Sequence, residues 1–379
     1  MNIKRALEVQ LLSKIDYTKA IILLGPRQVG KTTLIKEIAH KTDPAYLYIN
    51  GDEPSVQQFF ASASLPFLRS YLGNSKVIVI DEAQRIHNIG LTLKLIIDNF
   101  QDRQVLVTGS SALELANSIN EPLTGRKWEY RLYPISWAEI SLHQTLSQSL
   151  PRIPNLLVFG MYPDVINNAG NEIEIINNLA SSYLYKDLLN FQGIRKPELL
   201  NKILQALAWQ IGSEVSLNEI SRTVQADKNT VSHYMELMEK AFIIYKLSPL
   251  NRNLRTEISS SRKIYFYDNG IRNAVVGNYS PLSVRNDTGA LWENFLISER
   301  IKLLKYNGFY GNIHFWRTHA QQEIDYIEYI DGEYHAFEFK WNPKAKSKFS
   351  KTFLEAYKPK TALTIHQENF WEWLQHYPY

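Results

Sequence analysis

The chain has 379 residues, of which 45% are hydrophobic and 21% are charged, which predicts two or three folded domains and excludes a disordered protein. Its formal net charge of +4 does not indicate a dedicated nucleic-acid-binding domain, and the absence of cysteine excludes disulfides, thiolate metal sites and a cysteine nucleophile. No apolar run is long enough to cross a membrane and the first residues lack an apolar signal segment, so we expect a cytoplasmic protein without membrane contact.

Short apolar runs, separated by segments of helix length, characterise the sequence up to residue 145. The runs are Ala20–Leu24, Tyr46–Ile49, Val77–Ile80 and Val105–Val107. Runs of this kind are typical of parallel strands that are covered by helices on both faces. The pattern therefore predicts an α/β domain with a parallel sheet.

A phosphate-binding motif follows the first of these runs. Residues 25–32 read GPRQVGKT and match G-x-x-x-x-G-K-[ST], and the helical stretch Thr32–His40 comes next. Backbone N–H groups of such a loop surround phosphate oxygens, and the helix N-terminus adds partial positive charge. We expect Lys31 to neutralise the β and γ phosphates of ATP and the Thr32 hydroxyl to ligate Mg²⁺. The residues expected to contact ATP are Gly25, Pro26, Arg27, Gln28, Val29, Gly30, Lys31, Thr32, Thr33 and Ser110.

Acidic and hydroxyl side chains follow two further runs. Asp81 and Glu82 end the third run and resemble a Walker B motif, in which Asp81 would hold Mg²⁺ through water and Glu82 would activate the attacking water. Ser110 follows the fourth run, where it could sense the γ-phosphate or belong to an ordinary turn. Arg126 could stabilise the transition state, in the same or a neighbouring subunit, or have a surface role only.

Together the segments GPRQVGKTT, VIVIDEAQ, VTGSS and LTGR resemble the AAA-type ATPases of archaea and bacteria, in order and in spacing. The resemblance implies a P-loop ATPase core over residues 1–145 and a helical lid over 146–198. It assigns the nucleotide-site roles to Lys31, Thr32, Asp81, Glu82 and Ser110.

The segment 199–265 resembles a winged helix. Its pattern predicts helices at Leu199–Ile211, Leu217–Thr223 and Asn229–Ala241, followed by two strands. The third helix would be capped by Asp227 or Asn229. The residues that could face DNA are Lys228, Asn229, Ser232 and His233 on this helix and Arg252, Arg255, Arg262 and Lys263 in the wing. DNA binding and a structural or partner-binding role both stay open, because only one helix residue in this set is basic.

Two alternating strands near the C-terminus flank Asp331-Gly332, a pair typical of a two-residue hairpin turn. Such a turn pairs Ile330 with Glu333, which places Asp325 opposite Glu338. Carboxylates on directly opposed residues of paired strands are close enough to share one Mg²⁺, with Lys340 beside them to position a water.

This hairpin resembles the PD-(D/E)XK nucleases, and residues 266–379 resemble the α+β domain that commonly follows ATPases of this type. The resemblance implies catalytic roles for Asp325, Glu338 and Lys340 and metal ligation by Glu293, Asp325 and Glu338. The alternative is a surface hairpin whose charges form cross-strand pairs, such as Glu323 with Lys340.

These observations predict a Mg²⁺-dependent ATPase switch that acts on nucleic acid, including double-stranded DNA, through its winged-helix and nuclease-like regions. The alternative is a signalling or scaffold ATPase whose catalytically inert C-terminal domain binds a protein partner. The partners that we expect also include a second copy of the chain, in a homo-oligomer.

Overall fold

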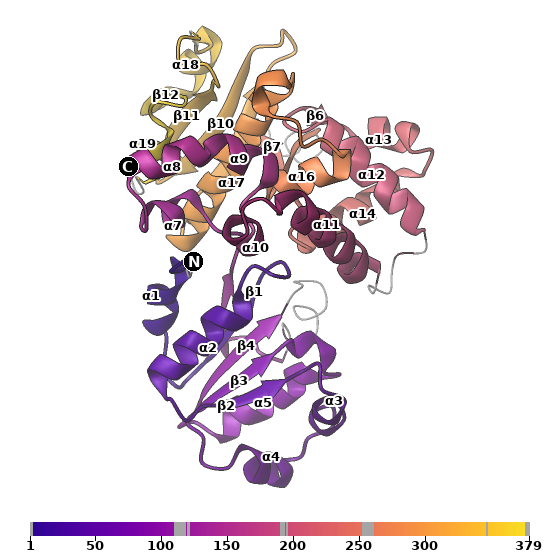
Figure 1. Ribbon diagram of the computed structural model, residues 1–379, viewed down its shortest axis with the longest axis vertical. Helices are drawn as coiled ribbons and strands as arrows, with labels where there is room; N and C mark the ends of the chain where they lie inside the picture. Colours follow the sequence, from indigo (N-terminus) through magenta and orange to yellow (C-terminus); the bar gives the residue numbers. More distant parts are fainter. Residues whose placement is uncertain are drawn as a thin grey trace.

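The computed structural model describes residues 3–109, 119, 122–189, 194, 196–251, 261–345 and 348–375, except for the side chains of 182–189. In Figure 1 the N-terminal sheet and its helices form the lower part of the molecule, and the later elements form the upper part. None of the described helices combines the length and the apolar composition that a bilayer span requires.

The N-terminal sheet has five strands, all parallel, in the order β2-β3-β4-β1-β5. The four predicted strands are confirmed, and β1, β3 and β4 are buried along their whole length. Strand β5 is not among the predicted strands, because this edge strand alternates charged and aromatic residues and has no apolar run. The bounds are β1 Ala20–Leu24, β2 Leu47–Asn50, β3 Val77–Asp81, β4 Gln104–Gly109 and β5 Lys127–Arg131.

Helices cover both faces of this sheet because successive strand residues point to opposite sides. Ile21 and Leu23 belong to the core cluster that contains α2 residues, whereas Ile22 and Leu24 belong to the cluster that contains α5 residues. The helices of this part are α1 Leu7–Leu12, α2 Lys31–Thr42, α3 Pro54–Phe60, α4 Leu65–Leu72, the 3-10 helix η1 Ala83–Arg85 and α5 Ile89–Asn99.

The middle of the chain is helical. The first of its helices, α7, begins with a capping box in which Ser136 and Glu139 exchange side-chain and backbone hydrogen bonds. The three helices predicted between residues 199 and 241 are present with ends shifted by at most two residues, and Asp227 caps the third. The bounds are α7 Trp137–Ser141, α8 Leu146–Ser149, η2 Leu150–Arg152, α9 Ile153–Phe159, α10 Pro163–Asn167, α11 Glu172–Leu189, α12 Pro197–Trp209, α13 Leu217–Thr223 and α14 Lys228–Lys240.

A second, mixed sheet has seven strands in the order β12-β11-β10-β9-β7-β8-β6. Its strands are β6 Glu214–Val215, β7 Ile244–Pro249, β8 Arg262–Phe266, β9 Asn312–Arg317, β10 Glu323–Ile330, β11 Glu333–Phe339 and β12 Thr361–Ile365. The helices around it are α16 Asn269–Val276, η3 Leu282–Val284, α17 Thr288–Tyr306, α18 Lys351–Tyr357 and α19 Phe370–Trp373. Because β7 pairs with β9 in parallel, one sheet spans the boundary expected near residue 265.

The β10–β11 hairpin has the predicted register, with Ile330 paired to Glu333. Asp331 and Gly332 both have positive φ values, 52° and 83°, as a type I′ turn requires. The turn therefore fixes which side chains of the two strands face each other.

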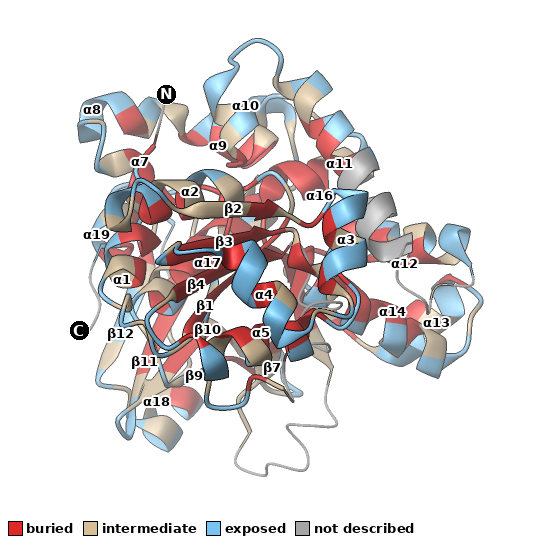
Figure 2. Ribbon diagram, turned by 90° about the horizontal axis from the view of Figure 1, so that it is seen from below, coloured by how far each residue is buried: buried red, intermediate tan, exposed pale blue. Residues whose placement is uncertain are grey.

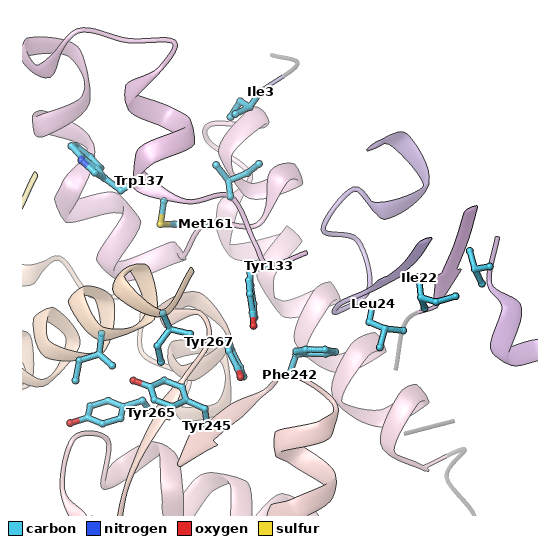
Figure 3. Close-up of a cluster of buried hydrophobic side chains, with 14 of the residues drawn as sticks. Ile3, Ile22, Leu24, Tyr133, Trp137, Met161, Phe242, Tyr245, Tyr265 and Tyr267 are labelled. Atoms are coloured by element: carbon cyan, nitrogen blue, oxygen red, sulfur yellow. The ribbon is translucent and has the colours of Figure 1, made fainter. Parts of the chain in front are cut away.

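Aromatic side chains join the two parts of the molecule. Tyr133, which follows β5, stacks on Tyr267 with ring centroids 5.4 Å apart and meets the edge of Phe242. Figure 3 shows these rings together with Tyr245 and Tyr265 from the second sheet. Figure 2 shows that buried residues concentrate on the strands and on α17, whereas helices such as α4 carry exposed residues. Residues 133–137, which follow β5 and which we call the linker, thus contribute to the core of the upper part.

Candidate nucleotide site and C-terminal acidic cluster

The phosphate loop connects β1 to α2. Gln28 and Gly30 have φ values of 59° and 93°, so the backbone turns through left-handed conformations on either side of Val29. Gly25 is required for a different reason, since a Cβ atom at this position would lie 2.1 Å from the carbonyl oxygen of Leu132. The loop is therefore shaped by its glycines and by the chain that follows β5.

Lys31 is the first residue of α2 and is only 5% exposed. Its ammonium group donates hydrogen bonds to the carbonyl oxygens of Gly25, at 2.9 Å, and Pro26, at 2.7 Å. The lysine thus lies over the loop, where its charge is available to a phosphate group.

Asp81 ends β3 and faces the start of α2. Its carboxylate accepts hydrogen bonds from the Thr32 hydroxyl, at 2.9 and 3.2 Å, and from the Tyr48 hydroxyl, at 2.7 Å. The Thr108 hydroxyl on β4 also donates to it. Burial and this bond to Asp81 raise the pKa of Tyr48, which keeps the phenol as a donor. Three neutral hydroxyl donors therefore fix the orientation of Asp81.

Glu82 has the left-handed backbone conformation φ 49°, ψ 42°, which is uncommon for a residue other than glycine. Its N–H donates to the Thr108 hydroxyl at 3.1 Å, and its carboxylate accepts a bond of 2.5 Å from the Gln84 amide. Strained backbone of this kind is frequent at functional sites. Thr108 therefore contacts both acidic residues at the end of β3.

A cavity of about 170 Å³ adjoins the phosphate loop. It lies between the N-terminal segment, the first turns of α2, the chain after β5 and α10. Its lining residues are Ile3, Arg5, Val29, Gly30, Thr33, Leu34, Glu37, Ile135, Pro163 and Asn167. Most of these walls are apolar, which suits a flat ring system beside the phosphate site.

The predicted C-terminal side chains do come together. Lys340 contacts Glu338 at 3.2 Å and Asp325 at 3.9 Å, and the Phe339 N–H donates to Asp325 at 2.8 Å. Glu293 on α17 accepts a bond from Lys263 at 3.1 Å, and the same lysine also pairs with Glu323. We call these six residues, Lys263, Glu293, Glu323, Asp325, Glu338 and Lys340, the acidic cluster.

The pKa values of three side chains in the acidic cluster are shifted. Burial raises the pKa of Glu338 to about 7, and the charge of Asp325 acts in the same direction. Burial also raises the pKa of Glu293, although Lys263 beside it acts in the opposite direction. Burial alone would lower the pKa of Lys340, but Asp325 and Glu338 outweigh that effect and raise it. Within the described part of the chain, no three His, Asp or Glu side chains are arranged as a metal site.

Comparison with known proteins agrees with the geometry of the phosphate loop and of the acidic residues beside it. Residues 17–141 match a family model described as an AAA domain. The N-terminal region is an AAA-type P-loop domain. Two further models, Domain of unknown function (DUF8612) and Domain of unknown function (DUF4143), match residues 150–282 and 288–376.

Similar proteins extend beyond the AAA-type domain. An uncharacterised protein of Mycobacterium tuberculosis is 26% identical over 343 residues, covering 89% of this chain and 74% of its own. An uncharacterised protein of Methanocaldococcus jannaschii is 25% identical and covers 69% of this chain and 63% of its own. The Walker-type ATPase of Pyrococcus abyssi, a solved structure, has a TM-score of 0.49 at 15% identity and covers 71% of this chain and 94% of its own.

One predicted residue of the AAA-type domain, Arg126, is not at the phosphate loop. Arg126 precedes β5 at the end of the sheet opposite the loop, because Ala20 pairs with Lys127 whereas the loop follows Leu24. It forms an ion pair of 2.6 Å with Asp98. It therefore does not reach the loop of its own chain, and a role in a neighbouring subunit stays a prediction. Ser110 lies outside the described residues.

The predicted nucleic-acid side chains are also distributed differently. Lys228, Asn229 and His233 are exposed on α14 as expected, and Ser232 is half-buried. Arg252 and Arg255 lie outside the described residues. The prediction of Lys263 as a wing contact is wrong: this residue is 2% exposed, because β8 is an inner strand of the second sheet and Glu293 and Glu323 compensate its charge.

Proposed function

We propose that this protein is a Mg²⁺-dependent ATP hydrolase whose AAA-type domain carries the active site. The observation that carries this proposal is the contact between Thr32, at the start of α2, and Asp81, at the end of β3, beside the buried Lys31. These are the groups that P-loop enzymes need for the phosphates and their metal ion.

The residues at this contact fit a magnesium ion. A hydroxyl and a carboxylate that face each other at 2.9 Å supply the hard oxygen ligands that Mg²⁺ prefers, directly or through water. When bound, the ion supplies positive charge to the β and γ phosphate oxygens. Tyr48 and Thr108 would keep Asp81 oriented toward it.

The remaining groups complete the hydrolysis of ATP. Lys31 would move from the Gly25 and Pro26 carbonyls to the phosphates, which are stronger acceptors. Glu82 would take a proton from water as the water oxygen bonds to the γ phosphorus and the bond to ADP breaks. The cavity beside Gly30 would hold the base.

Replacing Thr32 with valine tests the magnesium role, because valine keeps the volume and the branching but removes the hydroxyl. We expect turnover to fall about 10- to 100-fold and the Mg²⁺ concentration at half-maximal rate to rise. Phosphate release measured across a Mg²⁺ titration checks this. Thr42→Val at the far end of α2 is the matched control. An unchanged Mg²⁺ dependence in Thr32→Val would remove this residue from the metal site.

A second candidate activity, cation-dependent cleavage of phosphodiesters, is favoured by one observation: Asp325, Glu338 and Lys340 converge on one side of the β10–β11 hairpin. The acids would hold the metal ion and Lys340 would position the attacking water. The ATP hydrolase would then act on double-stranded DNA, with α14 as a contact surface.

Glu338→Gln tests this activity against Glu333→Gln, an exposed residue of the same strand. We expect wild type to nick supercoiled DNA with Mg²⁺ or Mn²⁺, and Glu338→Gln to lose about 100-fold or more of that rate. Glu333→Gln should cleave normally. Equal products from wild type and Glu338→Gln would instead favour an inert C-terminal domain that binds a protein partner.

A further inference from the structure

Arg5 connects three segments that are distant in the sequence. Its guanidinium donates to the Val29 carbonyl and the Tyr133 carbonyl, both at 2.6 Å, and pairs with Glu139 at 3.0 Å. The residue is 8% exposed. A buried guanidinium needs several acceptors, so the three contacts are expected to move together.

The contact with Val29 acts on the phosphate loop itself. Val29 lies between Gln28 and Gly30, which both have left-handed backbone conformations. Because the glycine imposes little torsional preference of its own, a charge-assisted bond to the Val29 carbonyl restrains the direction of the neighbouring N–H groups. Arg5 thus fixes a part of the loop that the phosphate-binding motif leaves adjustable.

The other two contacts lead to helix α17. The Tyr133 N–H donates to the Tyr306 hydroxyl at 3.1 Å, and the Trp137 N–H donates to Glu299 at 2.6 Å. Between them, Lys302 donates to the Ile135 carbonyl at 3.0 Å and pairs with Glu299 at 2.6 Å. Three side chains of α17 therefore hold the linker of residues 133–137 by its backbone.

Glu139 connects Arg5 to the start of α7. One of its carboxylate oxygens accepts from Arg5 and from the Ala6 N–H, and the other accepts from the Ser136 N–H at the start of α7. The linker that α17 holds thus supplies the Tyr133 carbonyl that accepts from Arg5, and its Ser136 N–H donates to the carboxylate that pairs with Arg5. Helix α17 also carries Glu293 of the acidic cluster, so a rigid helix runs from that cluster to the linker.

We propose that Arg5 is a positioning residue for the phosphate loop and that α17 sets its position through the linker, so that nucleotide binding and the C-terminal region influence each other. The inference rests on the proposed ATP site. Coupling of two sites is reciprocal: if α17 affects nucleotide affinity, the nucleotide must affect α17 to the same degree.

The affinity of wild type, Arg5→Lys and Tyr306→Phe for MgATPγS tests whether Arg5 and α17 position the phosphate loop. Lysine keeps the charge but cannot reach all three acceptors, so we expect its Kd to rise about tenfold or more. Tyr306→Phe keeps the ring and removes only the hydroxyl, and its Kd should rise about two- to fivefold. Tyr245→Phe is the control, since this buried hydroxyl has no hydrogen-bond partner among the described residues. Its Kd should not change.

Amide hydrogen exchange of residues 299–306 tests whether α17 is coupled to the nucleotide site, because a change in the stability of the loop alone would not alter exchange in α17. We expect MgATPγS to slow exchange there in wild type and to have less effect in Arg5→Lys at saturating nucleotide. If Arg5→Lys does not fold, Tyr306→Phe serves for both measurements.

The outcomes separate this inference from the proposed function. Failure of wild type to bind MgATPγS contradicts the ATP site itself. Wild-type binding with unchanged affinity in Arg5→Lys and Tyr306→Phe overturns the positioning role. Binding that leaves exchange in residues 299–306 unchanged in wild type overturns the coupling.

Discussion

Glu82→Gln is expected to lower ATP turnover by about 100- to 10,000-fold while nucleotide affinity stays within a few-fold of wild type. Glutamine has the shape of glutamate but cannot accept the proton of the attacking water. The hydrogen bond from the Glu82 N–H to Asp81 involves only the backbone of Glu82 and is kept in this variant, so we expect the groups that would bind ATP to be unaffected. Phosphate release and MgATPγS binding, measured on the same preparation, separate the two effects.

Glu53→Gln is the matched control for this variant, because it makes the same change at an exposed residue before α3. It should hydrolyse ATP at the wild-type rate. If Glu82→Gln were equally active, the base would have to be another residue. If it lost binding as well, the left-handed backbone at this position would be the cause.

Lys31→Ala is expected to weaken MgATP binding by about 100-fold or more, because two charge-assisted contacts with phosphate oxygens are lost. The lysine already lies against the Gly25 and Pro26 carbonyls, and its removal leaves those acceptors without their donor. Titration of a fluorescent ATP analogue provides the affinity, and thermal unfolding shows whether the domain remains folded.

Lys41→Ala on the same helix controls for the loss of a positive charge from α2, since Lys41 lies in the last turn of the helix, whereas the loop precedes the first turn. Its affinity should match wild type. Equal affinity in Lys31→Ala would mean that nucleotide does not bind at this loop.

The nucleotide site could be predicted where its signal is contiguous in the sequence. The motif of residues 25–32 and the apolar runs specify both the chemistry and the strand that positions it. The hairpin register was predictable for a similar reason, because Asp331-Gly332 allows one turn type and the pairing follows by counting.

Other residues of the site could not be predicted because they reach it only through tertiary contacts. Tyr48 and Thr108 orient Asp81 from neighbouring strands, and nothing in their local sequence marks them. Arg5 precedes the first helix in a segment without a motif. Lys263 looked like an exposed wing residue because its partners Glu293 and Glu323 are 30 or more positions away in the chain.

Arg126 was expected at the ATP site, and the end of the sheet at which it lies explains why it is not there. A motif gives the order of residues but not which end of the sheet they occupy. Arg126 precedes its strand whereas Asp81 ends one, so the two residues lie at opposite ends of parallel strands.

Phosphate release from ATP by the wild-type protein, with Mg²⁺ and with EDTA, tests the central claim most directly. Lys31→Ala protein purified in parallel serves as the blank. We expect release with Mg²⁺, none with EDTA and none from Lys31→Ala. Release at the same rate from wild type and Lys31→Ala, or no release from wild type with Mg²⁺, would contradict ATP hydrolysis at this site.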